Sequence, residues 1–522
     1  MNKKKANLFH NSHNFREKIF LQSLLVGLAS GFVVILYRLC IEKTDEYRDS
    51  VYIFLKNNNF IFTVLWIILL SGIGVALGFI LKKEPLSGGS GIPQIKGILS
   101  YQIESNWIKT LISKFIGGVL AIAAGLSLGR EGPSVQLGAS CGEGINKLFI
   151  KDKLREKYLI TAGASAGLSA AFNAPLAGVI FSLEELHKNF SPYVLLSSAT
   201  ASLTADFIAQ NIFGIAPIFN FTAMKTIPFS IYFYLILLGV IMGILGTLFN
   251  LSITGSMKLY EKLKFLPQVV IPIIPILFAI IFGFILPEIL GGGHRLINNL
   301  TVIDYGLKIL VVLFISKYFL TIVSFGSGVP GGIFLPLLCI GAIFGAIYGD
   351  ILYTFKQIDQ SYIKNFIALA MSAYFTAIVK APITGSILIT EMTGSLNHLF
   401  SLMTVSMVAY LTSDILKTKP IYDVLLYRLL KKRSDIQVNV GDENKIILEI
   451  QVSIGSLLSY KRINEIAWPS DVLIVGIKRG DNEVIPKGNV VILPNDYLMI
   501  LTALENAGKV NKEISSLAEE IK

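Results

Sequence analysis

Four long apolar stretches constrain the fold of this chain more than any other feature of its sequence. Each holds about 20 residues with few charges, which is the length that a helix needs to cross the hydrocarbon core of a bilayer. The stretches are Phe60 to Leu81, Ile231 to Leu251, Pro267 to Leu290 and Tyr305 to Phe325. The 522 residues are 53% hydrophobic and only 16% charged, with a mean hydropathy of +0.64. We therefore expect an α-helical membrane protein with several spans.

Other apolar stretches are shorter or are interrupted by glycine and proline. Interrupted helices are typical of transporters, in which broken helices surround a binding site. The apolar run that follows Lys18 continues to Ile41 without a small-residue cleavage site. We interpret it as an uncleaved first membrane helix.

Basic residues concentrate in segments that we expect to face the cytoplasm. An excess of lysine and arginine marks cytoplasmic loops, and it occurs at the N-terminus, in Lys147 to Lys157 and in Arg428 to Arg433. The net charge of +11 therefore reflects topology and not nucleic-acid binding. We expect a multi-pass protein of the inner (plasma) membrane with both termini cytoplasmic. The five histidines and three cysteines lack the spacing of metal ligands, so neither a metal nor a cofactor is expected.

The composition changes after the basic run that ends at Arg433. Residues 435–522 hold 13 acidic and 9 basic residues, a net charge of −4, so that +15 remains for the part before them. We predict a membrane domain over 1–433 and a small cytoplasmic α/β domain over 434–522. In the second domain, turn signals separate three β-rich runs and a closing helix, which are Ile446 to Val452, Val472 to Ile477, Val490 to Leu493 and Ala503 to Ile521.

A weak internal repeat occurs within the membrane domain. Ala174 to Gly178 (APLAG) resembles Ala381 to Gly385 (APITG), and each segment begins an apolar helix that carries a glutamate near its end, Glu185 in the first and Glu391 in the second. Matching broken segments in two halves of a transporter indicate a binding site at their interface. Chance similarity between two glycine- and alanine-rich helices is the alternative.

Three glycine- and proline-rich segments each stand directly before an apolar stretch. Glycine lets the backbone approach an ion closely, and proline near the first turn starts a helix without wasting an N–H donor. The free N–H groups and the helix dipole then bind an anion through partial charges, weakly enough to release it. The alternative is that they are only kinks at close helix crossings. The segments are Gly89 to Pro93 (GSGIP), Gly129 to Pro133 (GREGP) and Gly326 to Pro336 (GSGVPGGIFLP).

These segments closely resemble the signature of the CLC chloride channel and transporter family. GSGIP, GREGP and, at Gly331 to Pro336, GGIFLP occur in the order of the family, and FNAPLAG at Phe172 to Gly178 matches it as well. The resemblance covers most of the chain up to the basic run at Arg428 to Arg433. It implies an inverted-repeat fold with broken helices and a homodimer in which each subunit has its own pore.

The resemblance also implies which residues bind the anion. Ser90 and Tyr422 match the hydroxyl donors of the central chloride site. Ile333 and Phe334 match its backbone N–H donors. From the sequence pattern alone, Tyr422 is typical of the tyrosines at a membrane interface. The resemblance also places Lys114 where the family has a lysine beneath the pore. The other expected anion-binding positions are Gly89, Gly91, Arg130 and Gly132.

Two glutamates match the proton-handling acids of the family. Glu131, within GREGP, matches the gating glutamate whose carboxylate competes with chloride for the outer site and is displaced when it is protonated. Glu185, next to Glu184, matches the inner proton acceptor of the antiporters. The alternatives are that Glu131 only pairs with the neighbouring Arg130, and that Glu185 belongs to a solvated helix end.

The tail departs from the paired nucleotide-binding modules of many eukaryotic family members. Val472 to Asp496 resembles instead the C-terminal subdomain of RCK proteins, the TrkA-C type. Such subdomains commonly dimerise and bind small ligands, so we expect a regulatory domain with a small-molecule ligand. A plain assembly module without a ligand is the alternative.

The function predicted from these features is proton-coupled chloride antiport, with chloride and protons as transported ions and membrane lipid as the surroundings. A passive voltage- or ligand-gated chloride channel on the same scaffold is the alternative. A cation transporter regulated by the tail is disfavoured because the membrane domain has no TVGYG-like filter and no ring of acids. An enzyme is disfavoured because no nucleophile stands beside a base or a metal cluster.

Overall fold

The computed structural model describes residues 3–57, 59–188, 190–219, 221, 224–263, 265–434, 445–480, 482–503 and 506–519. The chain divides into two compact units. The larger is formed by Met1–Ile95, Asn106–Lys151 and Arg155–Leu425, and the smaller by Lys96–Ser105, Asp152–Leu154 and Leu426–Lys522. The expected boundary at 433/434 falls at the end of helix α17 (Ile421–Ser434) and stays a prediction.

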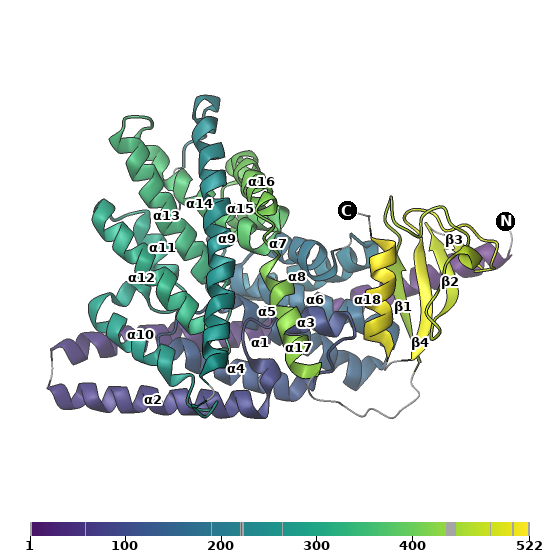
Figure 1. Ribbon diagram of the computed structural model, residues 1–522, viewed down its shortest axis with the longest axis horizontal. Coiled ribbons are helices and arrows are strands. Elements are labelled where there is room, and N and C mark those ends of the chain that lie inside the picture. Colours follow the sequence, from purple (N-terminus) through teal and green to yellow (C-terminus); the bar gives the residue numbers. More distant parts are fainter. Residues whose placement is uncertain are drawn as a thin grey trace. The chain divides into compact units, whose positions relative to one another are not determined.

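The larger unit is helical (Figure 1), and the order of helices α1 to α16 along the chain gives two series of eight. The first series is α1 (Lys3–Lys56), α2 (Phe60–Lys83), α3 (Ile92–Leu99), α4 (Trp107–Ala123), α5 (Glu131–Ile145), α6 (Lys153–Phe172), α7 (Pro175–Phe181) and α8 (Pro192–Phe213). The second series is α9 (Tyr232–Lys262), α10 (Ile273–Ile285), α11 (His294–Leu300), α12 (Gly306–Gly326), α13 (Phe334–Thr354), α14 (Ile363–Val379), α15 (Pro382–Thr393) and α16 (Leu399–Ile415). Each helix thus has a counterpart eight helices later.

The counterparts also share local detail. A 3-10 turn that begins at proline follows α2 (Pro85–Ser87), and another follows α10 (Pro287–Ile289). The fully buried Lys114 of α4 donates to two carbonyls in and just after the first turn, and the fully buried Lys317 of α12 does the same at the second, over distances of 2.6 to 2.9 Å. A buried ammonium is tolerated when its protons are hydrogen-bonded. The two halves therefore share one internal construction.

Several helices are long and apolar enough to cross a bilayer. They are Arg16–Lys56, Phe60–Lys83, Phe229–Lys262, Gly306–Gly326, Phe334–Thr354 and Gln360–Val379. Three of the four predicted spans are found here, whereas the prediction of one span over Pro267 to Leu290 was wrong. The α-helix in that stretch is limited to Ile273–Ile285, because Pro272 precedes its start and Pro287 begins a separate 3-10 turn after it.

Small residues bring the central helices close together. A Cβ atom at Gly138 of α5 would collide with the carbonyl of Gly163 in α6, and a Cβ atom at Gly163 would collide with the carbonyl of Gly138. Two α-helices approach this closely only where both lack side chains, as in other membrane bundles. In the second half, α13 and α14 are 83% buried over their apolar windows. The interior of the unit is therefore built around α5, α6, α13 and α14.

The smaller unit contains a four-stranded antiparallel sheet in the order β1-β4-β2-β3, with a helix, α18, packed on it (Figure 1). Its elements are β1 (Lys445–Gln451), β2 (Leu473–Arg479), β3 (Asn482–Val484), β4 (Tyr497–Ala503) and α18 (Ala507–Ala518). Alternate residues of β1 and β4 are buried, as expected for a sheet with one covered face. The buried stripe of α18 at residues 507, 510, 514 and 518 has helical spacing.

Three predictions for the tail were accurate and one was wrong. The first two β-rich runs coincide with β1 and β2, and the closing helix is α18, although Ile521 lies outside the described residues. Val490 to Leu493 forms only an isolated bridge between Arg462 and Val491, and the fourth strand is Tyr497–Ala503 instead. Asp496, whose side chain is 1% exposed, anchors this loop through Arg479. The hydrogen bonds from Arg479 to Asp496 raise the pKa of the guanidinium.

Candidate functional site

The three glycine- and proline-rich segments meet through their main chains. Gly331 N–H donates to the carbonyl of Gly89 at 3.0 Å, which ties the third segment to the first. Gly129 and Gly332 exchange hydrogen bonds of 2.7 and 2.8 Å, which ties the third segment to the second. Segments more than 200 residues apart thus form one framework, and the starts of α3, α5 and α13 converge on it.

Two glycines in this framework leave no room for a side chain. A Cβ atom at Gly132 would lie 2.5 Å from Ser90 Oγ. Gly91 has φ +97°, a conformation that favours glycine, and a Cβ atom there would lie 2.6 Å from Gln136 Oε1. The glycines therefore hold the Ser90 turn directly against the first turn of α5.

Ser90 and Tyr422 present two buried hydroxyl groups. They are 2% and 0% exposed, and neither hydroxyl has a partner within 3.5 Å among the described residues, although the two face each other closely enough for a weak, long hydrogen-bonding interaction. A buried hydroxyl without a partner costs about 1–3 kcal/mol. An anion between them would satisfy both donors, so this pair fits the ligand chemistry of a small anion.

The start of α13 offers further donors. Ile333 is the residue before the helix and Phe334 is its first residue, and the first N–H groups of a helix have no intrahelical acceptor. The ring of Phe334 is held between Phe172 and Phe375, with centroid distances of 5.4 and 4.6 Å. This packing holds the first residue of α13 in place, and the N–H groups there carry the positive end of the α13 dipole.

Glu131 already places a carboxylate at this helix start. It is fully buried as the first residue of α5, and its Oε2 accepts a hydrogen bond of 3.4 Å from Leu335 N–H of α13. Its Oε1 has no partner among the described residues. Arg130 turns away from it and pairs with Glu42 of α1 at 3.0 Å. The interpretation of Glu131 as a simple ion-pair partner of Arg130 therefore does not match the geometry.

The expected lysine beneath the site acts on the backbone. Lys114 Nζ lies 2.6 Å from the carbonyl of Gly89 and 2.9 Å from that of Ser87. It thereby holds the turn that presents Ser90. No contact of Lys114 reaches the hydroxyl of Ser90 itself among the described residues.

Glu185 lies on a wide helical turn, Ser182–His187, that continues α7. It is 2% exposed, so the alternative of a solvated helix end does not fit. Its charge acts on the hydroxyl of Tyr422, as does the charge of Glu131. The structure thus places Tyr422 within the electrostatic reach of both acids.

Sequence reasoning missed what Glu184 and Glu391 do. Glu184 accepts a hydrogen bond of 2.7 Å from Thr384 N–H, and Glu391 accepts one of 2.7 Å from Ala177 N–H. Each carboxylate also accepts from the preceding N–H group, at 3.2 and 3.0 Å. Glu184 therefore caps the start of α15 while Glu391 caps the start of α7.

A signal for this exchange was present in the sequence. Glu184 stands nine residues after Pro175, and Glu391 stands nine residues after Pro382. The repeat therefore aligns Glu391 with Glu184, and the earlier pairing of Glu391 with Glu185 was wrong. Proline has no N–H to cap, so the two N–H groups after it are the first that need an acceptor.

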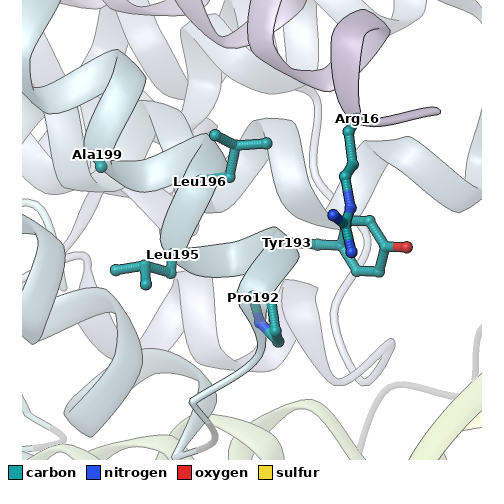
Figure 2. A pocket seen from close by; sticks show the side chains of 6 residues that line it. All are labelled: Arg16, Pro192, Tyr193, Leu195, Leu196 and Ala199. Carbon is teal, nitrogen blue, oxygen red and sulfur yellow. The ribbon is translucent and has the colours of Figure 1, made fainter. Parts of the chain in front are cut away.

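An apolar hollow lies against the start of α8, lined by Arg16 and residues of α8 (Figure 2). The guanidinium of Arg16 lies over the ring of Tyr193, 5.9 Å from its centroid. The remaining lining residues are Pro192, Leu195, Leu196 and Ala199. These side chains offer neither an acid nor a nucleophile. No group of metal-ligating side chains occurs in the described part of the chain either.

Comparison with known families decides where the chain belongs. Residues 73–414, more than half of the chain, match the family model described as "Voltage gated chloride channel". The chain is a CLC protein. Residues 447–515 match the TrkA-C domain model, so the CLC part is followed by the α/β domain that the tail sequence indicated.

Curated relatives of this CLC protein are named "H(+)/Cl(-) exchange transporter ClcA". The protein of that name from Vibrio cholerae serotype O1 (strain ATCC 39541 / Classical Ogawa 395 / O395) is 35% identical over 422 residues, which cover 79% of this chain and 89% of the relative. Another, from Salmonella arizonae (strain ATCC BAA-731 / CDC346-86 / RSK2980), is 31% identical over 427 residues, covering 80% and 89%.

Solved structures confirm the CLC fold. The structure described as a slow cyanobacterial Cl-/H+ antiporter has a TM-score of 0.75 and 28% identity, and the match covers 80% of this chain and 99% of that chain. A CLC-type fluoride/proton antiporter has a TM-score of 0.66 and 22% identity, covering 76% and 96%. The predicted fold class, helical with broken helices and a small α/β domain, is therefore correct.

Proposed function

We propose that this CLC protein exchanges chloride for protons across the membrane, with Glu131 as the gate and Glu185 as the inner proton acceptor. The observation that supports this most is the position of Glu131, whose carboxylate accepts from Leu335 N–H at the start of α13. That carboxylate is an anion tethered at an anion site. The same reaction is supported by the relatives, which are named exchange transporters, and by the 28% identical structure, which is described as an antiporter.

Chloride is bound by partial charges in this proposal. The hydroxyl groups of Ser90 and Tyr422 and the N–H groups of Ile333 and Phe334 replace part of the hydration shell. Arg130 gives none of these hydrogen bonds, because its guanidinium pairs with Glu42. Gly89, Gly91 and Gly132 act by letting the backbone come close. Binding without a full countercharge keeps release fast.

The gate works by competition. An ionised Glu131 carboxylate holds the α13 N–H groups, so chloride cannot occupy the same place. Protonation removes the negative charge, weakens the hydrogen bond from Leu335 and frees the side chain to leave. Chloride then enters, and the same carboxylate carries the proton onward.

A second acid must exchange that proton with the cytoplasm. Glu185 is buried on the turn after α7, and its charge acts on the hydroxyl of Tyr422. The charge of Glu131 acts on the same hydroxyl. Because both acids interact with Tyr422, which lines the central anion site, proton transfer between them depends on whether an anion occupies that site. Without the second acid, the same scaffold would conduct chloride passively.

The assembly and topology complete the proposal. The protein is a homodimer in the inner (plasma) membrane, with one pathway in each subunit and both termini in the cytoplasm. The tail is a regulatory domain that binds a small molecule. Its physical link to the pathway is α17, which begins at Ile421, carries Tyr422 in its first turn and ends at Ser434.

Proteoliposome flux with simultaneous recording of chloride and pH tests this function. A chloride gradient imposed across the membrane should drive protons against their own gradient. Chloride movement without any proton movement would replace the exchanger with the channel. Failure to move chloride at all, in liposomes where Ser90 and Tyr422 are intact, would remove both.

A further inference from the structure

Two buried arginines from different helices share one carboxylate. Glu42 Oε1 accepts a hydrogen bond of 2.9 Å from Arg38 Nε and one of 3.0 Å from Arg130 Nη1. Arg38 and Arg130 are 8% and 7% exposed, whereas the side chain of Glu42 is 40% exposed. The carboxylate is therefore the most exposed member of the cluster.

The two guanidinium groups keep their places through other contacts. Arg38 Nη1 donates to Asn173 Oδ1 at 2.8 Å, and the guanidinium lies 3.7 Å from the ring centroid of Phe213. Arg130 is fixed at the start of α5, and its Nε is buried without a hydrogen-bond partner among the described residues. A buried N–H donor without an acceptor is costly, so Arg130 has hydrogen-bonding capacity left for an anion.

The charges of the cluster do not balance at every stage of transport. Arg38, Arg130 and Glu42 sum to one positive charge, and the charge of Arg130 also acts on Glu131. While Glu131 is ionised, two carboxylates oppose two guanidinium groups. Once Glu131 is protonated, one positive charge remains among buried groups, where an uncompensated charge is unfavourable. An anion is then favoured at the cluster.

The position of the cluster along α1 places it away from the cytoplasm. Glu42 follows Arg16 by 26 residues, since 42 − 16 = 26, and a helix rises about 1.5 Å per residue, or about 39 Å in all. The hydrocarbon core is only about 30 Å thick. With the N-terminus in the cytoplasm, Glu42 therefore reaches the outer surface.

We propose that Arg38 and Arg130 form a recruitment site for a small monovalent anion at the outer mouth of the pathway, which Glu42 occupies as a tethered competitor. The inference rests on the proposed chloride transport and adds a site before the gate. Once Glu131 is protonated, incoming chloride displaces the Glu42 carboxylate and is held by the two guanidinium groups before it passes the gate. Fixed positive charge at a narrow mouth raises the local anion concentration.

An acidic exterior favours recruitment, because protonation of Glu42 removes the competitor. Other ionisable groups face the cluster from neighbouring elements. They are Tyr37 on α1, Glu131 on α5 and His294 at the start of α11. Protonation of His294 adds a positive charge and acts in the same direction as protonation of Glu42.

Transport kinetics of three variants test the site. Glu42→Gln should lower the apparent KM for chloride by roughly tenfold, since the competitor is gone while both arginines remain. Arg38→Gln should raise it, and the double variant should return near the unmodified value. Glu46→Gln, which alters an exposed pair with Lys43 on the same helix, is the matched control and should leave KM unchanged. An unchanged or raised KM in Glu42→Gln would overturn the proposal.

Bromide, located by anomalous diffraction, separates this proposal from the proposed function. Crystals at a pH low enough to protonate Glu42 in spite of its two guanidinium partners should show bromide between Arg38 and Arg130, and Glu42→Gln crystals should show it at neutral pH as well. Bromide between Ser90 and Tyr422 but absent from the arginines in both cases would remove the recruitment site alone. Bromide at neither place would remove the proposed anion pathway itself.

Discussion

Glu184 and Glu391 cap helices in opposite halves of the membrane domain. Glu184 accepts a hydrogen bond of 2.7 Å from Thr384 N–H, and Glu391 accepts one of 2.7 Å from Ala177 N–H. Glu391 sits near the end of α15 and caps α7, while Glu184 follows α7 and caps α15. The two caps therefore connect segments that are about 200 residues apart in the sequence. They tie the two halves at the level of the turn that holds Glu185.

Removing one of these caps should lower stability without abolishing transport. We expect Glu391→Gln to cost about 1–2 kcal/mol, because an amide has one acceptor oxygen where the carboxylate has two, and its NH2 group would face one of the two N–H donors. Thermal denaturation in detergent measures it, with the exposed Glu46→Gln as control. Loss of proton movement at normal stability would contradict a capping role.

The two proposed proton acids should be separable in one assay. Glu185→Gln should abolish proton movement while chloride still passes, because an amide cannot exchange a proton and the anion site is untouched. Glu131→Gln should remove proton coupling and pH dependence together, since the gate is then permanently neutral. Parallel chloride and pH recordings in proteoliposomes measure both.

Glu184→Gln provides the matched control for Glu185→Gln. The two positions are adjacent, but Glu184 has its carboxylate on α15. We expect that variant to be less stable and still coupled. Equal loss of proton movement in both variants would show that the turn as a whole, and not the acid at 185, had been disturbed.

Ser90 should set anion selectivity. Its hydroxyl is a single directed donor beside the backbone of Gly132, and a proline there would remove that donor and leave the less selective N–H groups. We expect chloride to be preferred over fluoride in the unmodified protein, and Ser90→Pro to lose discrimination against nitrate. Flux ratios with substituted anions measure this, and unchanged ratios would exclude the serine as the selective element.

Deletion of Asp435 to Lys522 should preserve selectivity and change activity. The tail is acidic and rich in turns, so it cannot line a path through the bilayer. Helix α17 connects the tail to Tyr422, which is the second residue of that helix. Flux before and after deletion, with cytoplasmic small molecules added, measures the effect. A stable truncation that lost chloride selectivity would place the tail in the pathway.

Asp496→Asn should loosen the sheet of the tail. Asp496 is buried and accepts from Arg479 twice and from Leu493 N–H, each at 2.8 Å. Loss of its charge should cost about 2–3 kcal/mol, since a hydrogen-bonded ion pair and a loop anchor are weakened together. Hydrogen exchange of Tyr497–Ala503 in the full chain measures this. The exposed Glu483→Gln serves as the control, and equal protection in both variants would contradict the assignment.

Local sequence patterns predicted the parts of this molecule that local physics determines. Glycine and proline before an apolar run predicted the starts of α3, α5 and α13 correctly, because both residues act within one turn. Hydropathy failed for Pro267 to Leu290, where it indicated one long helix but Pro272 marks the start of the helix and Pro287 starts a separate turn after it. Proline geometry outweighed the average composition of the window.

Contacts between residues far apart in the sequence could not be predicted from local patterns. The pairing of Arg130 with Glu42 joins residues 88 apart, and no spacing rule connects α5 to α1. The strand at Tyr497–Ala503 was missed because it has few β-branched residues, whereas Val490 to Leu493 has them but lies in a loop that Asp496 anchors. Tertiary context decided which run paired in the sheet.

The framework at Gly89, Gly129 and Gly332 is bonded through main-chain atoms and the ammonium of Lys114, and the side chain of Ser90 takes no part in these bonds. Its shape is therefore independent of which side chain stands at Ser90, provided that the neighbouring glycines remain. Ion preference can change by a single substitution while the architecture around it is inherited unaltered. Such a separation of scaffold from selectivity lets one fold serve different anions over evolutionary time.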